Sequence, residues 1–255
     1  MITHKNGFGN DKFCTFLSHG NETVITPIPP PKPYFWDVSR GSSSPHQCTL
    51  TGVTQSSTGG VFNNSPCWNA TSFGGGFRVL SCDTNTSDWN FGTNNFCIDF
   101  WIKVTGGGPI SAVGQNFGSN GCVFNSNNFY GFFIDGGISP LLTHSTGLTF
   151  GVKNAGSWDF FLTMSGITSI WPDAVNWYHV AVSRYFDTIR LFFNGKIVAT
   201  KKITPTYSMP LLNFPYLIGG ISSVISSLSA YYCEFRITNG HYRWKRDFIP
   251  PNRMY

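Results

Sequence analysis

Charged side chains are scarce in this sequence. Only 11% of the 255 residues are Asp, Glu, Lys or Arg, and the only glutamates are Glu22 and Glu234. Long runs of Glu, Lys, Ala and Leu, which favour helices, are also missing. Glycine and phenylalanine are abundant instead, at 28 and 24 residues. This composition indicates strands and turns, and it disfavours helix throughout the chain.

Long apolar runs are missing as well. No segment approaches the roughly 20 apolar residues that span a membrane, and residues 1–20 lack the apolar core of a signal peptide. The net charge is a mild +5, and the basic residues are scattered apart from Lys201–Lys202 and the Arg243–Arg246 segment. Such small clusters are typical of solvated surface. We therefore expect a soluble chain that is not secreted by the usual route and binds neither membrane nor nucleic acid.

The sequence also lacks the usual catalytic signatures. Retaining glycosidases need two carboxyl groups about 5 Å apart, but the two glutamates lie near opposite ends of the sequence. No Gly-x-Ser-x-Gly, His-Glu-x-x-His or phosphate-binding Gly-Lys-Ser/Thr motif occurs. His179 has no nucleophile beside it and no evident partner, so a packing role is favoured over that of a general base. We predict a protein that is not an enzyme and has no catalytic residue.

Cysteine is present but not in metal-binding or redox patterns. The chain has seven cysteines, an odd number, and no Cys-x-x-Cys motif. Cys97 and Cys233 fall inside apolar strand patterns, where a free thiol acts as a small hydrophobe. We expect mostly free, buried thiols and assembly in a reducing cell.

The clearest structure signal is the stretch Trp177–Ile203. Apolar residues alternate with polar ones, which places one set of side chains on a buried face and the other toward water or a second layer. Phe186–Asp187 marks one turn, and Asn194–Gly195 tolerates the positive φ angles of a type I′ hairpin turn. This stretch predicts three antiparallel strands.

The same alternation recurs elsewhere. In Phe96–Val104 the even-numbered residues share an apolar face, and in Tyr231–Thr238 the odd-numbered residues do so. Further short strands are predicted at Thr49–Val53, Ala70–Phe73, Phe77–Leu80, Ile110–Val113, Tyr130–Ile134, Leu148–Val152, Phe160–Met164 and Tyr216–Ile218. This many strands between glycine-rich turns predicts an all-β fold, a two-sheet antiparallel jelly-roll sandwich.

Residues 1–33 differ from the rest. Five prolines fall within Pro27–Pro33, which enforces an extended segment that cannot lie in a central strand. The segment is either a linker or an arm that anchors the protein to a neighbouring subunit. Phe13, Phe16 and Leu17 have no obvious local partner, which favours the arm. We predict an extended arm over residues 1–33 and one jelly-roll domain over 34–255.

Several motifs resemble one family. Residues 177–184 (WYHVAVSR) and 189–196 (IRLFFNGK) resemble the core of concanavalin A-like, laminin-G-type jelly-roll domains. Residues 87–92 (SDWNFG) and 97–103 (CIDFWIK) are similar to an entry strand of the same family. Residues 234–251 (EFRITNGHYRWKRDFIPP) resemble the ending typical of versions in virion proteins of tailed bacteriophages. The resemblance covers roughly residues 36–251.

The resemblance implies properties that the residues alone do not establish. Some family members bind calcium, for which Asp83, Asp88 and Asp135 are the candidates here. No dense cluster of oxygen ligands is apparent, so loop aspartates without metal are favoured and we predict no cofactor and no metal site. Where family members usually have Asp-Glu before Phe-Arg-Ile, this chain has Cys233–Glu234.

The sequence favours one of three functions. A glycosidase is disfavoured by the missing carboxylate pair. A lectin would use loop aromatics and amides, with Trp68, Trp158, Trp171 and Asn125–Tyr130 as candidates, although each tryptophan is better explained as a core anchor. The resemblance and the arm favour a non-enzymatic structural virion component that displays a lectin-like domain, with a carbohydrate-binding adhesin as the alternative.

This interpretation implies location and partners. We expect a capsid decoration, head fibre or tail-associated protein of the bacteriophage virion, assembled in the host cytoplasm. The expected partners are other virion proteins, contacted through the arm, together with host-surface glycans and further copies of the chain in a homo-oligomer.

Overall fold

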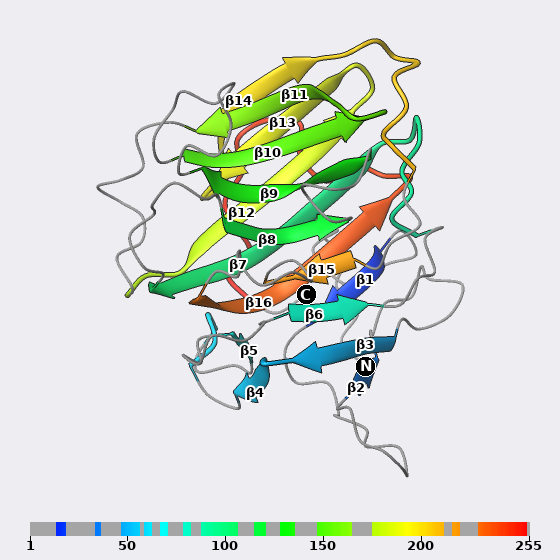
Figure 1. The fold of residues 1–255 in the computed structure, drawn as a ribbon. Coiled ribbons are helices and arrows are strands. Elements are labelled where there is room, and N and C mark those ends of the chain that lie inside the picture. Colours follow the sequence, from blue (N-terminus) through cyan, green and yellow to red (C-terminus); the bar gives the residue numbers. More distant parts are fainter. Residues whose placement is uncertain are drawn as a thin grey trace.

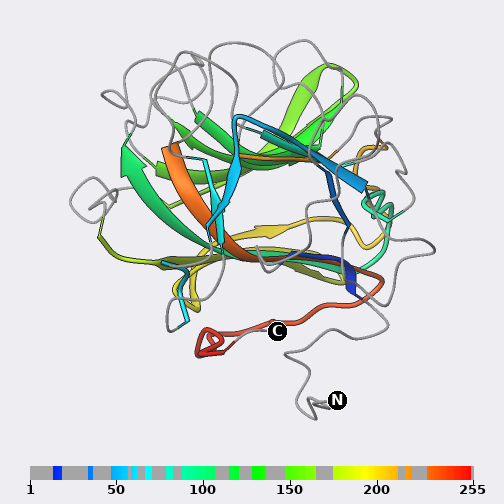
Figure 2. The ribbon, with the colours of Figure 1, turned by 90° about the horizontal axis from the view of Figure 1, so that it is seen from below.

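The chain folds into two antiparallel β-sheets that face each other (Figures 1 and 2). A computed structural model describes residues 14–18, 34–36, 47–56, 59–62, 67–70, 79–82, 88–106, 115–120, 128–135, 147–164, 175–211, 216–219 and 229–253. All regular elements within these ranges are strands. The predicted all-β, two-sheet sandwich is confirmed.

The sheet that holds the longest strands is called sheet A. Its strands lie in the order β14-β13-β12-β7-β16-β5-β4, and β1 pairs with β16 beside that path. Their bounds are β14 (Lys196–Lys202), β13 (Thr188–Phe193), β12 (Tyr178–Tyr185), β7 (Phe96–Gly106), β16 (Ser229–Asn239), β5 (Cys67–Asn69), β4 (Thr54–Ser56) and β1 (Cys14–Ser18).

The opposing sheet B contains eight strands in the order β11-β10-β9-β8-β15-β6-β3-β2. Their bounds are β11 (Ser157–Met164), β10 (Gly147–Asn154), β9 (Phe129–Asp135), β8 (Gln115–Asn120), β15 (Tyr216–Ile218), β6 (Val79–Cys82), β3 (Gln47–Thr51) and β2 (Tyr34–Trp36). Most predicted strands are present within a few residues of their expected bounds. The predicted strand Ile110–Val113 and residues 71–73 of the predicted Ala70–Phe73 strand lie outside the described residues, and Ala70 follows the end of β5.

The core lies between the sheets, and β7 shows why. Alternation sends every second side chain to the same face of a strand, and Phe96, Ile98, Phe100, Ile102 and Val104 all belong to the main buried cluster. Phe100 stacks on Phe235 of β16 and meets Phe132 of sheet B edge to face. The predicted apolar face of this strand is therefore confirmed.

The predicted assignment of side chains to the two faces of β16 is wrong for the N-terminal half of the strand. Tyr232, Phe235 and Ile237 all belong to the core cluster, whereas strict alternation would place Tyr232 on the opposite face. The pairing with β7 shifts between Cys233 and Arg236, and Glu234 adopts a φ of 52°. This β-bulge inserts an extra residue and reverses the alternation. The sequence pattern missed it because the left-handed residue is not a glycine.

The hairpins of Trp177–Ile203 form as predicted. Asn194 and Gly195 have φ angles of 47° and 76°, which fits the expected Asn-Gly turn between β13 and β14. Both faces of β12 are buried, because His179 and Ser183 are as fully buried as the apolar residues between them. The outward face of this strand therefore meets a second layer and not water.

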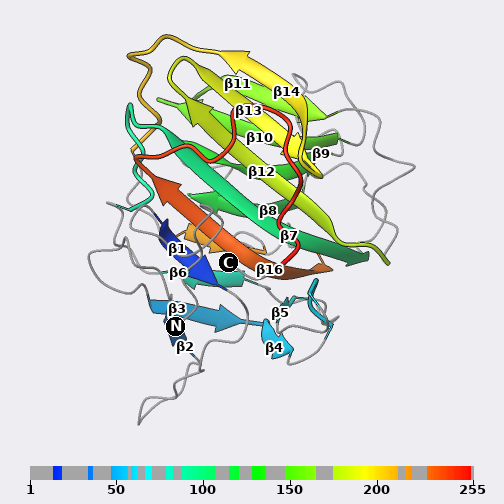
Figure 3. The same cartoon turned by 180° about the vertical axis from the view of Figure 1, so that it is seen from behind.

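That layer is the C-terminal segment, residues 240–253. It leaves the end of β16 and crosses the outer face of β12, β13 and β7, where Figure 3 shows it in red in front of these strands. Trp244 and Phe248 of the segment pack with Cys97, Ala181 and Phe192 in a second, smaller apolar cluster. The sandwich thus has a partial third layer on sheet A.

Part of the predicted N-terminal arm also joins sheet A. β1 pairs antiparallel with β16, with Phe16 opposite Ile237 and Leu17 opposite Arg236. The sequence did not predict this strand within the arm, and the expectation that the Phe16 and Leu17 side chains have no local partner stays a prediction. Residues 1–13 and 19–33 lie outside the described residues, and attachment of the arm to another protein stays a prediction.

Candidate functional site

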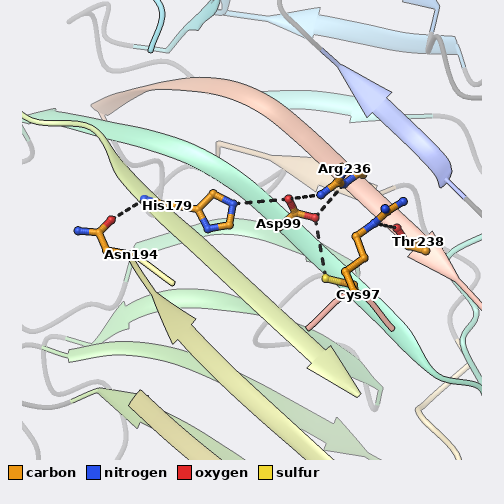
Figure 4. Close-up of polar contacts among 7 residues, drawn as sticks. Cys97, Asp99, His179, Asn194, Arg236 and Thr238 are labelled. Atoms are coloured by element: carbon orange, nitrogen blue, oxygen red, sulfur yellow. Dashed lines mark hydrogen bonds and ion pairs between the residues drawn. The ribbon is translucent and has the colours of Figure 1, made fainter. Parts of the chain in front are cut away.

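A buried polar cluster lies under the C-terminal segment, and we call Asp99, His179 and Arg236 the Asp99 cluster (Figure 4). They come from three adjacent strands, β7, β12 and β16. Arg236 donates to Asp99 from Nε (3.1 Å to Oδ1) and from Nη2 (2.9 Å to Oδ2). His179 Nε2 lies 3.5 Å from Asp99 Oδ2, and all three side chains are fully buried.

The prediction that His179 has no partner was wrong. His179 pairs across the sheet with Trp101, so Asp99 is its diagonal neighbour on β7. Diagonal neighbours in a sheet lie within reach of long side chains. The backbone N–H of His179 also donates to Asn194 Oδ1 at 2.9 Å, which gives Asn194 a role beyond its turn. Asp99 and His179 lie 80 positions apart in the sequence. The sequence carries no local sign of their contact, because only the strand order brings them together.

The electrostatics of the cluster favour one charge state. Burial by itself raises the pKa of the Asp99 carboxyl, but Arg236 and the hydrogen bond from His179 outweigh burial and hold that pKa well below its usual range. Burial lowers the pKa of His179 below its ordinary value, and the positive charge of Arg236 adds to this effect against the opposing pull of Asp99. The cluster therefore holds an ionised Asp99, a charged Arg236 and a neutral His179.

Aromatic rings of the C-terminal segment cover the cluster. His179 contacts Trp244 and Phe248 edge to face, each with ring centroids 5.6 Å apart. The two rings stack on each other at 4.1 Å, and the Arg236 guanidinium lies 5.7 Å from the Trp244 ring. The Phe248 N–H donates to the Gly195 carbonyl at 2.8 Å, which fixes the segment to the β13–β14 turn.

This arrangement does not favour catalysis. Cys97 Sγ contacts Asp99 Oδ1 at 3.9 Å, but burial and the neighbouring carboxylate raise the pKa of the Cys97 thiol well above its ordinary value. A nucleophilic cysteine needs the opposite shift and access to substrate. No side chain of the Asp99 cluster is exposed. We therefore interpret the cluster as a structural contact that joins three strands and the C-terminal segment.

The predicted sugar-contacting tryptophans are distributed over the fold. Trp68 is buried in the core, which confirms its interpretation as an anchor. Trp158 on β11 is half-buried against Phe129 and Phe161, with ring centroids 5.8 and 4.6 Å away. Trp171 lies outside the described residues.

The predicted amide-rich run Asn125–Tyr130 is described only from Asn128 onward. Asn128 donates to the Leu211 carbonyl at 3.1 Å and accepts from the Ala155 N–H at 2.9 Å. Its amide thus connects two loops, and this explains the residue without a ligand.

The structure reveals a partly exposed group of aromatic residues that the sequence reasoning missed. The turn between β12 and β13 and the start of the C-terminal segment bring together Tyr185, Phe186, His241, Tyr242 and Lys245, which we call the Phe186 surface. Tyr185 contacts Phe186 and Tyr242 with ring centroids 4.8 and 4.3 Å apart. The one sequence feature that could have indicated this surface is a phenylalanine, Phe186, in a tight turn.

The calcium candidates do not meet in the described part of the chain. Asp83 lies outside the described residues, Asp88 precedes β7, and Asp135 ends β9. No group of three His, Cys, Asp or Glu side chains that could hold a metal is found among the described residues. Within the same residues, no helix is long and apolar enough to cross a membrane.

Comparison with known proteins identifies the family. The family model of the concanavalin A-like lectin/glucanases superfamily matches residues 81–243, which is more than half of the chain. The chain belongs to this superfamily. None of the curated proteins compared with it matches it in sequence.

Solved structures with the same fold include the binding domains of bacterial toxins. The binding domain of Paraclostridial Mosquitocidal Protein 1 superposes with a TM-score of 0.60 at 16% identity, over 92% of this chain and 49% of that one. The receptor binding domain of botulinum neurotoxin D gives 0.58 at 11% identity, over 93% and 50%. A structure concerning botulinum neurotoxin type C and its interaction with two ganglioside molecules gives 0.51 at 13% identity, over 88% and 47%. The chain spans about half the length of these structures, and the likeness establishes the fold alone.

Proposed function

We propose that this chain is a lectin-like domain that binds carbohydrate without catalysing a reaction on it. The observation that carries the proposal is membership of a superfamily of lectins and glucanases, together with a fold shared with the binding domains of toxins. One of those similar structures concerns ganglioside binding, and gangliosides carry sugar headgroups. Because function depends on the site and not on the fold, this support is by analogy.

The positions of the carboxyl groups favour a lectin over a glucanase, the two kinds of protein in this superfamily. A hydrolase needs two carboxyl groups that reach the same glycosidic bond. Asp99 and Glu234 are fully buried. Asp159, Asp187 and Asp247 each contact a partner side chain, namely Tyr207, Lys202 and Lys196. In the described ranges, these carboxylates act in the fold or as surface ion pairs.

A glycan array with the full-length chain tests the proposal. We expect binding to at least one class of glycan, and no release of reducing sugar from the glycans that bind. Absence of binding at millimolar sugar would reject the lectin role, and released sugar would reject the non-enzymatic role.

We further propose that the domain is displayed on a bacteriophage virion, assembled in the host cytoplasm as a homo-oligomer. Support comes from residues 234–251, which resemble the ending typical of tailed-bacteriophage virion proteins. Mass spectrometry of purified particles tests the location, and analytical ultracentrifugation tests the homo-oligomer. A protein absent from particles, or a monomer at all concentrations, would reject the corresponding proposal.

The arm is tested by a deletion that spares sheet A. Because β1 pairs with β16, the deletion removes residues 1–13 and leaves Cys14–Ser18 in place. We expect the truncated chain to fold but to be lost from particles. Incorporation at full occupancy would refute attachment through this segment.

A further inference from the structure

Phe186 occupies a backbone position that phenylalanine normally avoids. It forms the two-residue turn between β12 and β13 with Asp187, and its φ is 51°. Bulky residues in the left-handed region cost free energy, and tight turns normally place Gly, Asn or Asp there. The other hairpin of this stretch follows that rule with Asn194–Gly195. Residues that break a local rule often mark a functional position.

The strained turn is held from both sides. The Phe186 N–H donates to Asn95 Oδ1 at 2.8 Å, and the Phe186 carbonyl accepts from Arg184 Nε at 3.0 Å. Arg184 is fully buried and also donates to the carbonyls of Gly92 and Pro205, each at 3.2 Å. The backbone is therefore fixed, while 61% of Phe186 is exposed to solvent. An exposed aromatic side chain on a fixed backbone is preorganised for contact with a ligand.

The neighbours of Phe186 combine rings with polar atoms. The ends of β12 and β16 and the start of β7 meet at one end of sheet A, as Figure 3 shows. There Tyr185 packs on Phe186, and His241 stacks on Tyr242 at 5.4 Å. Tyrosine and histidine present an apolar ring and a hydrogen-bonding group together. The C–H face of a sugar ring packs on aromatic rings, and its hydroxyls need such polar groups.

The surface also carries a positive charge, and none of the ion pairs between described residues uses it. Lys245 is exposed, and its Nζ lies 5.2 Å from the Tyr185 ring and 5.9 Å from the Tyr242 ring. The ion pairs of exposed lysines among the described residues involve Lys196 and Lys202 and not Lys245. An ammonium group beside an aromatic surface favours an anionic group on a ligand that packs there.

We propose that the Phe186 surface binds an acidic saccharide, with a sugar ring packed on Phe186 and Tyr185 and its carboxylate near Lys245. The inference rests on the proposed carbohydrate-binding function and names its site and ligand class. A membrane is a less suitable ligand. Phe186 is the only large apolar side chain of the Phe186 surface that is more than half exposed, and its neighbours carry polar atoms.

Isothermal titration with two acidic probes, 3′-sialyllactose and tetragalacturonate, tests the proposal. Lactose and the methyl esters of both probes serve as uncharged counterparts. We expect the full-length chain to bind at least one acidic probe, and the probe that binds distinguishes sialic from uronic acids. Its methyl ester should bind several-fold more weakly, and added salt should weaken only the acidic form.

Variants locate the site. Phe186→Asn suits the left-handed backbone and removes the ring, so we expect about tenfold weaker binding by a folded protein. Phe186→Trp retains a ring and should retain binding. Lys245→Gln should abolish the preference for the acid over its methyl ester. Ile249→Asn is the matched control, because Ile249 is 85% exposed and follows Phe248, which contacts the opposite end of β12.

Each remaining outcome overturns the proposal. If the array shows glycan binding but Phe186→Asn leaves it unchanged, the chain is a lectin with another site. If only neutral glycans bind, the lectin role stands and the acidic ligand is wrong. If vesicles of phosphatidylcholine and phosphatidylserine bind in a Phe186-dependent manner while both saccharides do not, the surface is a membrane contact.

Discussion

Arg236 donates two hydrogen bonds to the carboxylate of Asp99 across β16 and β7, and neither side chain is exposed. A buried ion pair of this geometry contributes little net stability compared with apolar residues, but removal of one partner leaves an uncompensated buried charge. The pair forms in the register that places Arg236 opposite Asp99, just after the bulge at Glu234, and a shift of that register would separate the two charges.

Asp99→Ala should destabilise the fold by about 3–5 kcal/mol, because Arg236 stays buried without its counter-charge. The double variant Asp99→Leu with Arg236→Met should recover much of that loss. Urea denaturation followed by tryptophan fluorescence measures both effects. Lys196→Gln, which breaks the exposed pair with Asp247, serves as the control and should leave the midpoint nearly unchanged. A small effect of Asp99→Ala would show that water reaches the cluster.

Acid should destabilise the protein in two steps. The pKa of His179 is lowered in the folded state, so the unfolded chain binds protons more readily and stability falls as pH drops below about 6.5, the ordinary pKa of histidine. The pKa of Asp99 is also lowered, so its contribution is lost as pH falls below about 4, the ordinary pKa of aspartate. Urea denaturation at a series of pH values from about 8 down to about 2 measures both steps. His179→Phe should flatten the first step only, and an unchanged profile in that variant would assign the step to another group.

Gly195→Ala should release the C-terminal segment from sheet A. A Cβ on Gly195 would lie 2.0 Å from the Phe248 carbonyl oxygen, and Gly195 has a φ of 76°. Gly59→Ala provides a matched control, because Gly59 has a φ of 90° but no atom within 4 Å of the added Cβ. Both variants incur backbone strain of about 1–3 kcal/mol, but only Gly195→Ala should speed tryptic cleavage at Arg243 and Lys245. Equal cleavage rates in the two variants would contradict the contact.

The buried thiols should resist alkylation in the native protein. Cys67, Cys97 and Cys233 are free and buried, as predicted for Cys97 and Cys233. Burial raises the pKa of Cys97, whereas the hydrogen bond from Cys233 lowers the pKa of Cys67. Iodoacetamide in increasing urea, followed by peptide mapping, should label Cys67 before the other two. Labelling of Cys97 in the absence of urea would show that the C-terminal segment opens readily.

Local patterns predicted those parts of the fold that obey local rules. Alternation in Phe96–Val104 and the Asn194–Gly195 turn gave the correct strands, because their backbone conformations follow from adjacent residues. The bulge at Glu234 and the pairing of β1 with β16 depend on contacts between distant segments. For this reason, the sequence did not predict them.

The candidate sites were harder to predict than the fold. His179 and Asp99 meet only through the order of strands in sheet A. The Phe186 surface combines a turn with the start of the C-terminal segment, and neither stretch has a recognisable binding motif. Hydrophobic periodicity reports which side chains are buried, whereas a binding surface consists of the exposed residues that periodicity leaves unassigned.

Phe186→Asn should stabilise the protein even as it weakens ligand binding. Asparagine tolerates the left-handed region better than phenylalanine, so relief of strain should contribute about 1 kcal/mol. Phe186→Ala is the control, because it removes the ring but keeps a side chain that disfavours a φ of 51°. Thermal unfolding should rank Phe186→Asn above the wild-type chain and Phe186→Ala below Phe186→Asn. If both variants unfold at lower temperature than the wild-type chain, the ring of Phe186 stabilises the fold through Tyr185, and its strained position needs no ligand to explain it.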